Sequence, residues 1–360
     1  MNILIIGGGE LGSMIADQLI SEGHAVTLIE KSEKTAKHLN EELDALVLNG
    51  SGIDVNILAR ANIENTELFL ALTNDDNVNI VSCNLVKKLS HYKAYTIAKV
   101  ENSSRYFSNP IIESADFGID NMIATRQLSI NKISDLIAEP ETIEIINFHD
   151  NDIKIVGIHV TDDFSGAGKK IHEITSLDKT WRKVRIIAVN KDNEVIIPSG
   201  NDVIDPGDRI FIIGNAESIK LVTQIYFPSV TRIKKIIILG GNRIGKELAR
   251  RESALGKTVT IVEEDEDVCS RLSEELGGVL IINGNGTNSA VLHELDMKDS
   301  FVACVTERDE QNIISAVLAK RNGAYKAVCN ITNIAITPII NEIRDIDSVF
   351  STESMSRISF

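Results

Sequence analysis

The sequence contains, twice, the pattern of a buried strand, a glycine-rich turn, a helix, a second strand and an acidic residue. In the first copy, the apolar run Ile3–Ile6 opens into Gly7-x-Gly9-x-x-Gly12, and a second apolar run ends at Glu30. Three glycines at this spacing allow a tight turn, close approach of backbone to a pyrophosphate, and close packing of helix on strand. The pattern predicts a dinucleotide site, and a glycine turn without a ligand is the alternative.

The residues around the turn also indicate which dinucleotide it would bind. The helix after the turn would offer N–H groups and the positive end of its dipole to phosphates. Glu30 could accept hydrogen bonds from ribose hydroxyls and would repel a 2′-phosphate. The first copy therefore favours NAD(H) over NADP.

The second copy repeats the glycine turn and the acid of the first at the same spacing. The distance in sequence from Gly7 to Gly240 equals that from Glu30 to Glu263. Further segments match after Glu30 and Glu263. LVLNGSG in the first copy matches LIINGNG in the second, and LFLALTNDDNVN matches FVACVTERDEQN. Such a repeat predicts a duplicated domain.

Alternating strands and helices follow Glu30 in the first copy. Strands are expected at Leu46–Leu48, Leu68–Leu72 and Ala94–Val100, with helical segments between them. This alternation predicts an α/β fold with a parallel, doubly wound sheet in each copy, that is, tandem Rossmann-like domains. Ligands of such sheets bind outside the carboxyl ends of the strands.

The candidate binding residues of the first copy all lie at that edge of the predicted sheet. The segment Thr73–Asp76 could equally form an ordinary polar turn and helix cap, and Lys99 could equally be a solvated surface lysine. The candidates are Gly7, Gly8, Gly9, Glu10, Leu11, Gly12, Glu30, Ser51, Thr73, Asn74 and Lys99.

The second copy departs from the first at its turn. Asn242 replaces the middle glycine, and its side chain could crowd a pyrophosphate. Arg243 follows at the helix N-terminus, where it could meet a terminal phosphate and favour ATP or ADP, or could be a surface arginine. Asn330 takes the place of Lys99. The candidates here are Gly240, Gly241, Asn242, Arg243, Ile244, Gly245, Glu263, Asn285 and Thr306.

The region between the copies has a different sequence pattern. Residues 111–129 carry mixed apolar and polar residues that lead into a crossover helix ending near Ala138, and Pro140 ends that helix. Short β-rich runs follow, with one helix expected at Gly168–Ile174, which predicts a small α+β lobe. We therefore expect domains at 1–139, 140–228 and 229–360. Trp181 is expected to serve packing.

Composition excludes several classes of function. The formal net charge is −15, which argues against binding nucleic acid. The sequence has no apolar run of the roughly 20 residues needed to cross a bilayer. Its four cysteines lack CxxC pairing and are expected to be buried reduced thiols of a cytoplasmic protein. The histidines show no metal-ligand spacing, so no metal site is predicted.

Taken together, the motifs resemble those of the RCK/KTN nucleotide-binding gating-ring family of the Trk and Ktr potassium-uptake systems. The resemblance rests on the first glycine turn with Glu30, the LNGSG turn, LTNDDNVN, IAKVEN and the segment Val184–Gly214, and it covers nearly the whole chain. It implies a cytoplasmic regulatory subunit that binds NAD(H), ATP or ADP. Such a subunit would form a homo-oligomer, as a dimer or tetramer ring, at the inner face of the membrane beneath a potassium channel subunit of TrkH or TrkG type.

One feature departs from tandem members of that family, which carry a second small lobe after the second nucleotide domain. Here the sequence ends at Phe360, before such a lobe. The chain is therefore expected to be a shortened form of a longer protein or a naturally short member.

An NAD-dependent oxidoreductase is the alternative function. Hydride transfer needs a substrate pocket with an acid–base residue against the nicotinamide. No extended substrate domain follows either turn, and no His, Lys or Tyr stands at a recognisable catalytic spacing. We therefore expect a regulator and not an enzyme.

Overall fold

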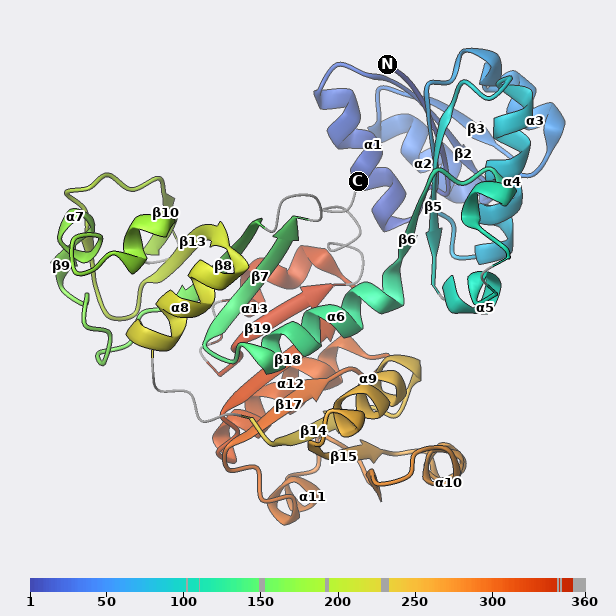
Figure 1. Cartoon of the computed structure of the whole chain (residues 1–360). Coiled ribbons are helices and arrows are strands. Elements are labelled where there is room, and N and C mark those ends of the chain that lie inside the picture. Colours follow the sequence, from blue (N-terminus) through green and yellow to red (C-terminus); the bar gives the residue numbers. More distant parts are fainter. Residues whose placement is uncertain are drawn as a thin grey trace. The chain divides into compact units, whose positions relative to one another are not determined.

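The computed structural model describes residues 1–101, 103–109, 111–148, 153–191, 194–227, 233–341, 343 and 345–351. The chain divides into two compact units, one centred on Met1–Ser129 and the other formed by Ile130–Phe350. Figure 1 shows the elements of both. Among the described residues, no helix combines the length and the apolar character needed to cross a membrane.

The first unit is built on a parallel sheet of six strands in the order β3-β2-β1-β4-β5-β6. This order is that of a Rossmann-like, doubly wound sheet, as predicted. The strands are β1 (Asn2–Ile6), β2 (Ala25–Glu30), β3 (Leu46–Asn49), β4 (Leu68–Ala71), β5 (Tyr95–Val100) and β6 (Asn121–Ala124).

Strand β6 was not expected, because residues 111–129 read as mixed sequence leading into a helix. The strand has four residues, and only Ile123 among them is fully buried, so the apolar run that marks the other strands is missing. The short 3₁₀ helix η2 (Ser114–Phe117) precedes it.

Helices cover both faces of this sheet. Ile5 of β1 packs in one apolar cluster with Ile15 of α1, and Leu4 packs in another with Val86 of α4. Successive strand residues point to opposite faces, so one apolar strand supplies both clusters. The helices are α1 (Glu10–Ser21), α2 (Glu33–Glu42), α3 (Val55–Arg60), η1 (Ile63–Asn65), α4 (Asp76–Leu89) and α5 (Ser103–Phe107).

The second unit starts within α6 (Thr125–Ala138), which ends at the residue predicted for the crossover helix. A five-stranded antiparallel sheet follows, in the order β11-β10-β13-β8-β7, beside the two-stranded sheet β12-β9. Its elements are β7 (Thr142–Phe148), β8 (Ile153–His159), β9 (Lys169–Lys170), α7 (Ile171–Ile174), η3 (Thr180–Lys183), β10 (Val184–Lys191), β11 (Glu194–Ile196), β12 (Val203–Ile204), β13 (Arg209–Asn215) and α8 (Ala216–Tyr226).

This small α+β lobe agrees with the expected β-rich runs, but two helical assignments differ. The helix expected at Gly168–Ile174 is wrong in its first part, because Lys169–Lys170 pairs with β12 as a short strand. Helix α8 was not expected at all. Trp181 is 1% exposed and packs against Phe164 and Tyr226, which confirms its expected packing role.

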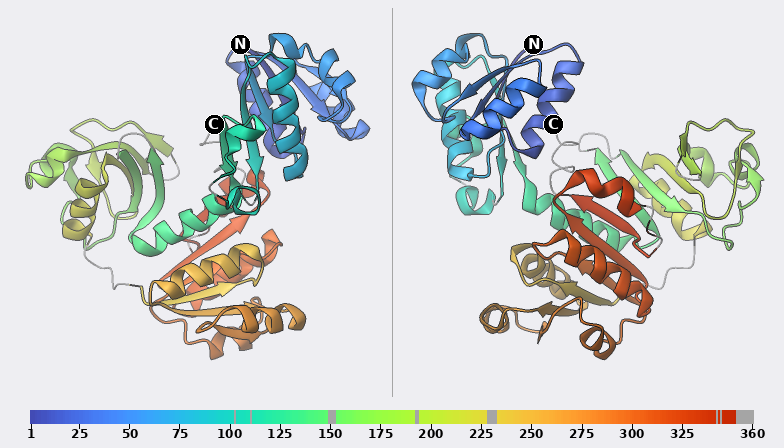
Figure 2. Two further views of the ribbon diagram at one scale, coloured as in Figure 1. Left: turned by 45° about the vertical axis from the view of Figure 1, so that its right-hand side comes forward. Right: turned by 180° about the vertical axis from the view of Figure 1, so that it is seen from behind.

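The second Rossmann-like sheet has the order β16-β15-β14-β17-β18-β19, the same as the first. Helix α9 covers one of its faces and α12 the other, as Figure 1 and the view from behind on the right of Figure 2 show. The elements are β14 (Lys235–Leu239), α9 (Arg243–Ala254), β15 (Thr258–Glu263), α10 (Glu266–Glu275), β16 (Leu280–Asn283), α11 (Ser289–Glu294), β17 (Ser300–Cys304), α12 (Asp309–Arg321), β18 (Lys326–Ile331), η4 (Ile334–Ile336), α13 (Thr337–Asn341) and β19 (Ser348–Ser351).

Helix α6 contacts both neighbours within the second unit. Asn131 accepts a hydrogen bond from Arg251 of α9 at 2.7 Å, and Lys132 donates to the carbonyl of Ile145 in β7 at 2.8 Å. All four cysteines are buried and free, as predicted.

Candidate functional site

The first glycine turn connects β1 to α1, and each of its glycines has a distinct geometric role. Gly7 has φ +96°, and a Cβ there would lie 2.9 Å from the Thr73 nitrogen. A Cβ on Gly12 would lie 1.9 Å from the carbonyl oxygen of Gly7. A Cβ on Gly9 would meet nothing within 4 Å. Gly7 and Gly12 are therefore required by the fold, whereas the space beside Gly9 is open to a ligand.

Glu30 anchors this turn at the end of β2. Its Oε2 accepts a hydrogen bond from the Gly8 N–H at 2.6 Å, and its Oε1 accepts one from the Ser32 N–H at 2.6 Å. A carboxylate oxygen can accept more than one hydrogen bond. Glu30 is thus fixed in place and can still accept from the hydroxyls of a ribose.

A cavity of about 530 Å³ opens between the turn and the carboxyl ends of the strands. Six of the predicted residues line it, and Lys31 and Thr35 add polar side chains that sequence reasoning missed. Asp75, from the predicted polar turn, also lines it and caps α4 by accepting from the Asn77 and Val78 N–H groups. The wall is formed by Ile6, Gly7, Gly9, Ile29, Glu30, Lys31, Thr35, Gly50, Ser51, Gly52, Ile53, Leu72, Thr73, Asn74, Asp75 and Val78.

Five predicted residues lie outside that wall. Lys99 donates to Asn74 Oδ1 at 3.0 Å, so it contacts the wall through a residue that lines it. The amide of Gly8 is bound to Glu30. The residues outside the wall are Gly8, Glu10, Leu11, Gly12 and Lys99.

Asn79 is a positioning residue that sequence reasoning did not single out. Its fully buried side chain accepts from the Thr73 N–H and hydroxyl at 3.0 and 2.7 Å. Its Nδ2 donates to the carbonyls of Thr73 and Lys99 at 2.9 and 2.8 Å. Asn79 therefore ties together the ends of β4 and β5. Its recurrence as Asn312 in the matched segment was the available signal.

The second glycine turn repeats this geometry between β14 and α9. Gly240 has φ +116°, and a Cβ on Gly245 would lie 2.0 Å from the Gly240 carbonyl oxygen. Glu263 accepts from the N–H groups of Gly241 and Asp265 at 2.7 and 3.0 Å. The second acid thus holds its turn in the same way as Glu30.

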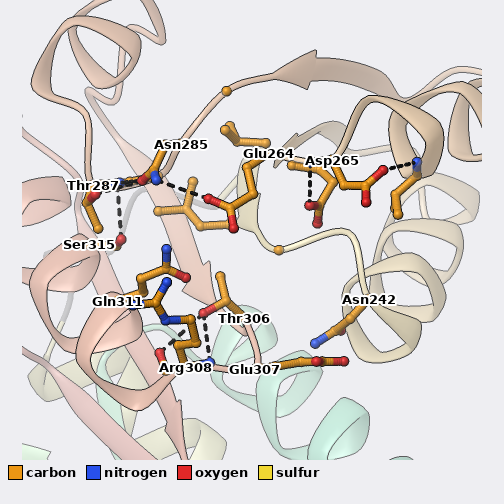
Figure 3. A pocket seen from close by; sticks show the side chains of 17 residues that line it. Asn242, Glu264, Asp265, Asn285, Thr287, Thr306, Glu307, Arg308, Gln311 and Ser315 are labelled. Carbon is orange, nitrogen blue, oxygen red and sulfur yellow. Dashed lines mark hydrogen bonds between the residues drawn. The ribbon is translucent and has the colours of Figure 1, made fainter.

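A cavity of about 380 Å³ lies beside this second turn (Figure 3). Asn285 connects two other residues of its wall. Its Nδ2 donates to Glu264 at 3.0 Å, and its Oδ1 accepts from the Thr287 N–H at 2.8 Å. The wall consists of Leu239, Gly240, Asn242, Val262, Glu263, Glu264, Asp265, Val268, Gly284, Asn285, Gly286, Thr287, Thr306, Glu307, Arg308, Gln311 and Ser315.

The predicted cation of the second copy is not part of that wall. Gly240, Asn242, Glu263, Asn285 and Thr306 line the cavity, whereas Gly241, Arg243, Ile244 and Gly245 do not. The cation that does line it is Arg308, at the N-cap of α12, which sequence reasoning missed. It corresponds in the repeat to Asp75, so a change of charge in the matched segment was the available signal.

Asn242 caps the helix that follows the second turn. Its Oδ1 accepts from the N–H groups of Ile244 and Gly245 at 3.0 and 3.1 Å, and its Nδ2 donates to the Val305 carbonyl. In the first copy Gly9 holds the N-cap position, and no side chain caps α1. The two turns therefore share a backbone course but differ at the group that would meet a phosphate.

The family models match most of the chain. The TrkA-N domain matches residues 3–125 and again 236–352, and the TrkA-C domain matches residues 144–225. The chain belongs to the TrkA family. This confirms the resemblance seen in the motifs, and the two TrkA-N matches correspond to the duplicated Rossmann-like sheets.

Individual relatives support the same assignment. The Trk system potassium uptake protein trkA homolog 1 of Methanosarcina mazei is 30% identical, over 95% of this chain and 84% of the relative. Among solved structures, the GsuK channel bound to NAD aligns with a TM-score of 0.71 at 18% identity, covering 99% of this chain and 62% of that one. GsuK bound to ADP aligns with a TM-score of 0.60 at 15% identity, covering 99% and 68%. These structures share the fold of this TrkA-family chain.

Proposed function

We propose that this chain is a cytoplasmic regulatory subunit that controls membrane potassium uptake according to the nucleotide bound in its first cavity. The observation that carries the proposal is the uncapped turn at Gly9, opening into a cavity of about 530 Å³ beside Glu30. A helix N-terminus without a side-chain cap can bind a phosphate group through its N–H groups. This arrangement supports the proposal that the first cavity binds a nucleotide.

The ligand we propose for the first cavity is NAD(H), with ATP and ADP as competitors for the adenosine part of the site. Glu30 at the end of β2 suits a ribose with free hydroxyls. Of the two GsuK structures that share this fold, one is bound to NAD and the other to ADP.

The partner we propose is a membrane potassium channel or transporter subunit of TrkH or TrkG type. The relative of this chain from Methanosarcina mazei is named as a potassium uptake protein of the Trk system. We also propose a homo-oligomeric ring, as a dimer or tetramer, located at the inner face of the membrane through this partner. Each chain would contribute the domains 1–139, 140–228 and 229–360.

Calorimetric titration of the full chain with NADH and ATP tests the ligand. We expect NADH to bind the wild type, and a Gly9→Val variant to lose that site while keeping its thermal stability, because a Cβ at this position has no protein atom within 4 Å. Unchanged NADH binding in Gly9→Val would contradict the assignment of the first turn.

Rubidium uptake tests the regulatory role. The chain is co-expressed with a TrkH-type subunit in cells that otherwise lack potassium uptake, and we expect uptake to require the chain and to change in Gly9→Val. Sustained oxidation of NADH by the purified chain with 2-keto acids would favour an oxidoreductase instead.

A further inference from the structure

Two N–H groups at the start of the helix after the second turn are already bonded to the protein. The N–H groups of Ile244 and Gly245 stand where those of Leu11 and Gly12 stand in the first turn, and both donate to the Asn242 carboxamide. The other end of that carboxamide is held by the Val305 carbonyl at the end of β17. A phosphate bound by these two N–H groups would have to displace both of their hydrogen bonds to Asn242.

The charges around the second cavity also oppose a phosphate. Its wall contains the carboxylates of Glu263, Glu264, Asp265 and Glu307 against the single guanidinium of Arg308. The first cavity has Glu30 and Asp75 against Lys31. Like charges in a partly enclosed site repel more strongly than in bulk water. A polyphosphate is therefore disfavoured in the second cavity by charge as well as by the cap.

The groups that would recognise a nucleoside are nevertheless retained. Glu263 is held by the Gly241 and Asp265 N–H groups in the same way as its counterpart Glu30 is held, with its carboxylate facing the cavity. Thr287, Gln311 and Ser315 add neutral polar side chains to the wall (Figure 3). The volume of about 380 Å³ is smaller than the 530 Å³ of the first cavity.

We infer that Asn242 closes the second turn to phosphate and that the second cavity binds a nucleoside without phosphates, such as adenosine. This inference rests on the proposed nucleotide-binding function of the first cavity, of which the second is a modified copy. One chain would then carry a dinucleotide site and a nucleoside site.

Titration calorimetry of the full chain in a Gly9→Val, Glu30→Ala background isolates the second cavity, because the first substitution excludes phosphates from the first cavity and the second removes its ribose acceptor. The probes are adenosine, AMP and NAD⁺. We expect adenosine to bind with one site per chain, and AMP and NAD⁺ to bind at least about tenfold more weakly, the factor that one lost hydrogen bond of average strength gives.

Adding Asn242→Gly should strengthen NAD⁺ binding by about tenfold and leave adenosine affinity within about threefold, since the ribose and base contacts are unchanged. Asn242→Ala serves the same purpose if the glycine variant fails to fold. Asn215→Gly is the matched control, because Asn215 caps α8 through the Ser218 N–H and lines neither cavity. It should change no ligand affinity.

Three results would overturn the inference: absence of adenosine binding in the Gly9→Val, Glu30→Ala variant, tighter binding of AMP or NAD⁺ than of adenosine in that background, or no gain in NAD⁺ affinity from removing the Asn242 side chain. Failure of the proposed function would be seen elsewhere, as failure of the wild-type chain to bind NADH at the first cavity.

Discussion

Gly9 and Asn242 occupy equivalent positions in two copies of one turn, and what each contacts differs completely. A Cβ at Gly9 would have no protein atom within 4 Å, whereas the Asn242 side chain bonds to the helix N-terminus and to the residue that follows β17. By contrast, a side chain at Gly12 or Gly245 would collide with the turn itself. Substitutions at the middle position therefore probe the ligand, and substitutions at the last glycine probe the fold.

Glu30 has a structural role as well as the ribose contact expected from sequence. Because its carboxylate accepts from the Gly8 and Ser32 N–H groups, Glu30→Ala leaves both donors without this acceptor. We expect the ligand-free variant to lose about 1–3 kcal/mol of unfolding free energy, and NADH binding to weaken by a similar amount. Urea unfolding and calorimetric titration measure the two effects.

The matched control for this prediction is Glu263→Ala. It removes the same pair of backbone contacts in the second copy, so stability should fall while NADH affinity at the first cavity stays the same. Unaltered NADH affinity in Glu30→Ala would rule out the ribose contact.

At the level of elements, the sequence located what depends on apolar pattern and missed what depends on tertiary contacts. The central strands of both Rossmann-like sheets consist of buried apolar runs such as Ile3–Ile6, which the sequence pattern identifies. Strand β6 buries one residue and forms because it pairs with β5. Asn242 was expected to crowd a ligand, but its bond to Val305 joins residues far apart in sequence, so its capping role required the structure.

Lys326 in β18 joins the second Rossmann-like sheet to the corner between α6 and β7. Its ammonium donates to the carbonyls of Pro140 and Thr142 inside the protein. Burial lowers the pKa of Lys326 from 10.5 to about 7, and the nearby carboxylates of Asp347 and Glu141 offset this only in part. The corner is thus held by a lysine whose charge is costly to bury.

This lowered pKa predicts a defined pH dependence of stability. Between about pH 7 and 10.5 the unfolded chain binds a proton at Lys326 that the folded chain does not, so this residue makes the folded state more stable as pH rises. We expect the unfolding free energy of the wild type, relative to Lys326→Met, to increase from pH 7 to pH 10. Urea unfolding of both proteins at several pH values measures it, and a constant difference would contradict the lowered pKa.

At the scale of the whole molecule, duplication has produced two lobes with the same strand order and different cavities. The scaffold elements recur residue by residue, as Asn79 and Asn312 show by making the same bonds to a threonine and a neighbouring strand. The groups at the middle of each glycine turn and at the N-cap of the helix after β4 or β17 do not recur, since Gly9 is replaced by Asn242 and Asp75 by Arg308. Fold could therefore be predicted from the repeat, whereas ligand choice depends on the positions where the copies differ.

We expect the chain to form a homo-oligomer, and two exposed apolar side chains indicate a surface through which the copies could contact one another. Ile111 and Ile112, between β5 and β6, are 83% and 39% exposed. Exposed apolar side chains that lie together are typical of interaction sites. We expect light scattering at micromolar concentration to give a multiple of the mass of one chain, and Ile111→Asp to shift the measured mass toward that of the monomer.

Ile197→Asp is the control, because Ile197 is 91% exposed but lies in the small lobe. A monomer at every concentration would contradict a ring, and equal effects of the two substitutions would show that Ile111 has no special place in the interface.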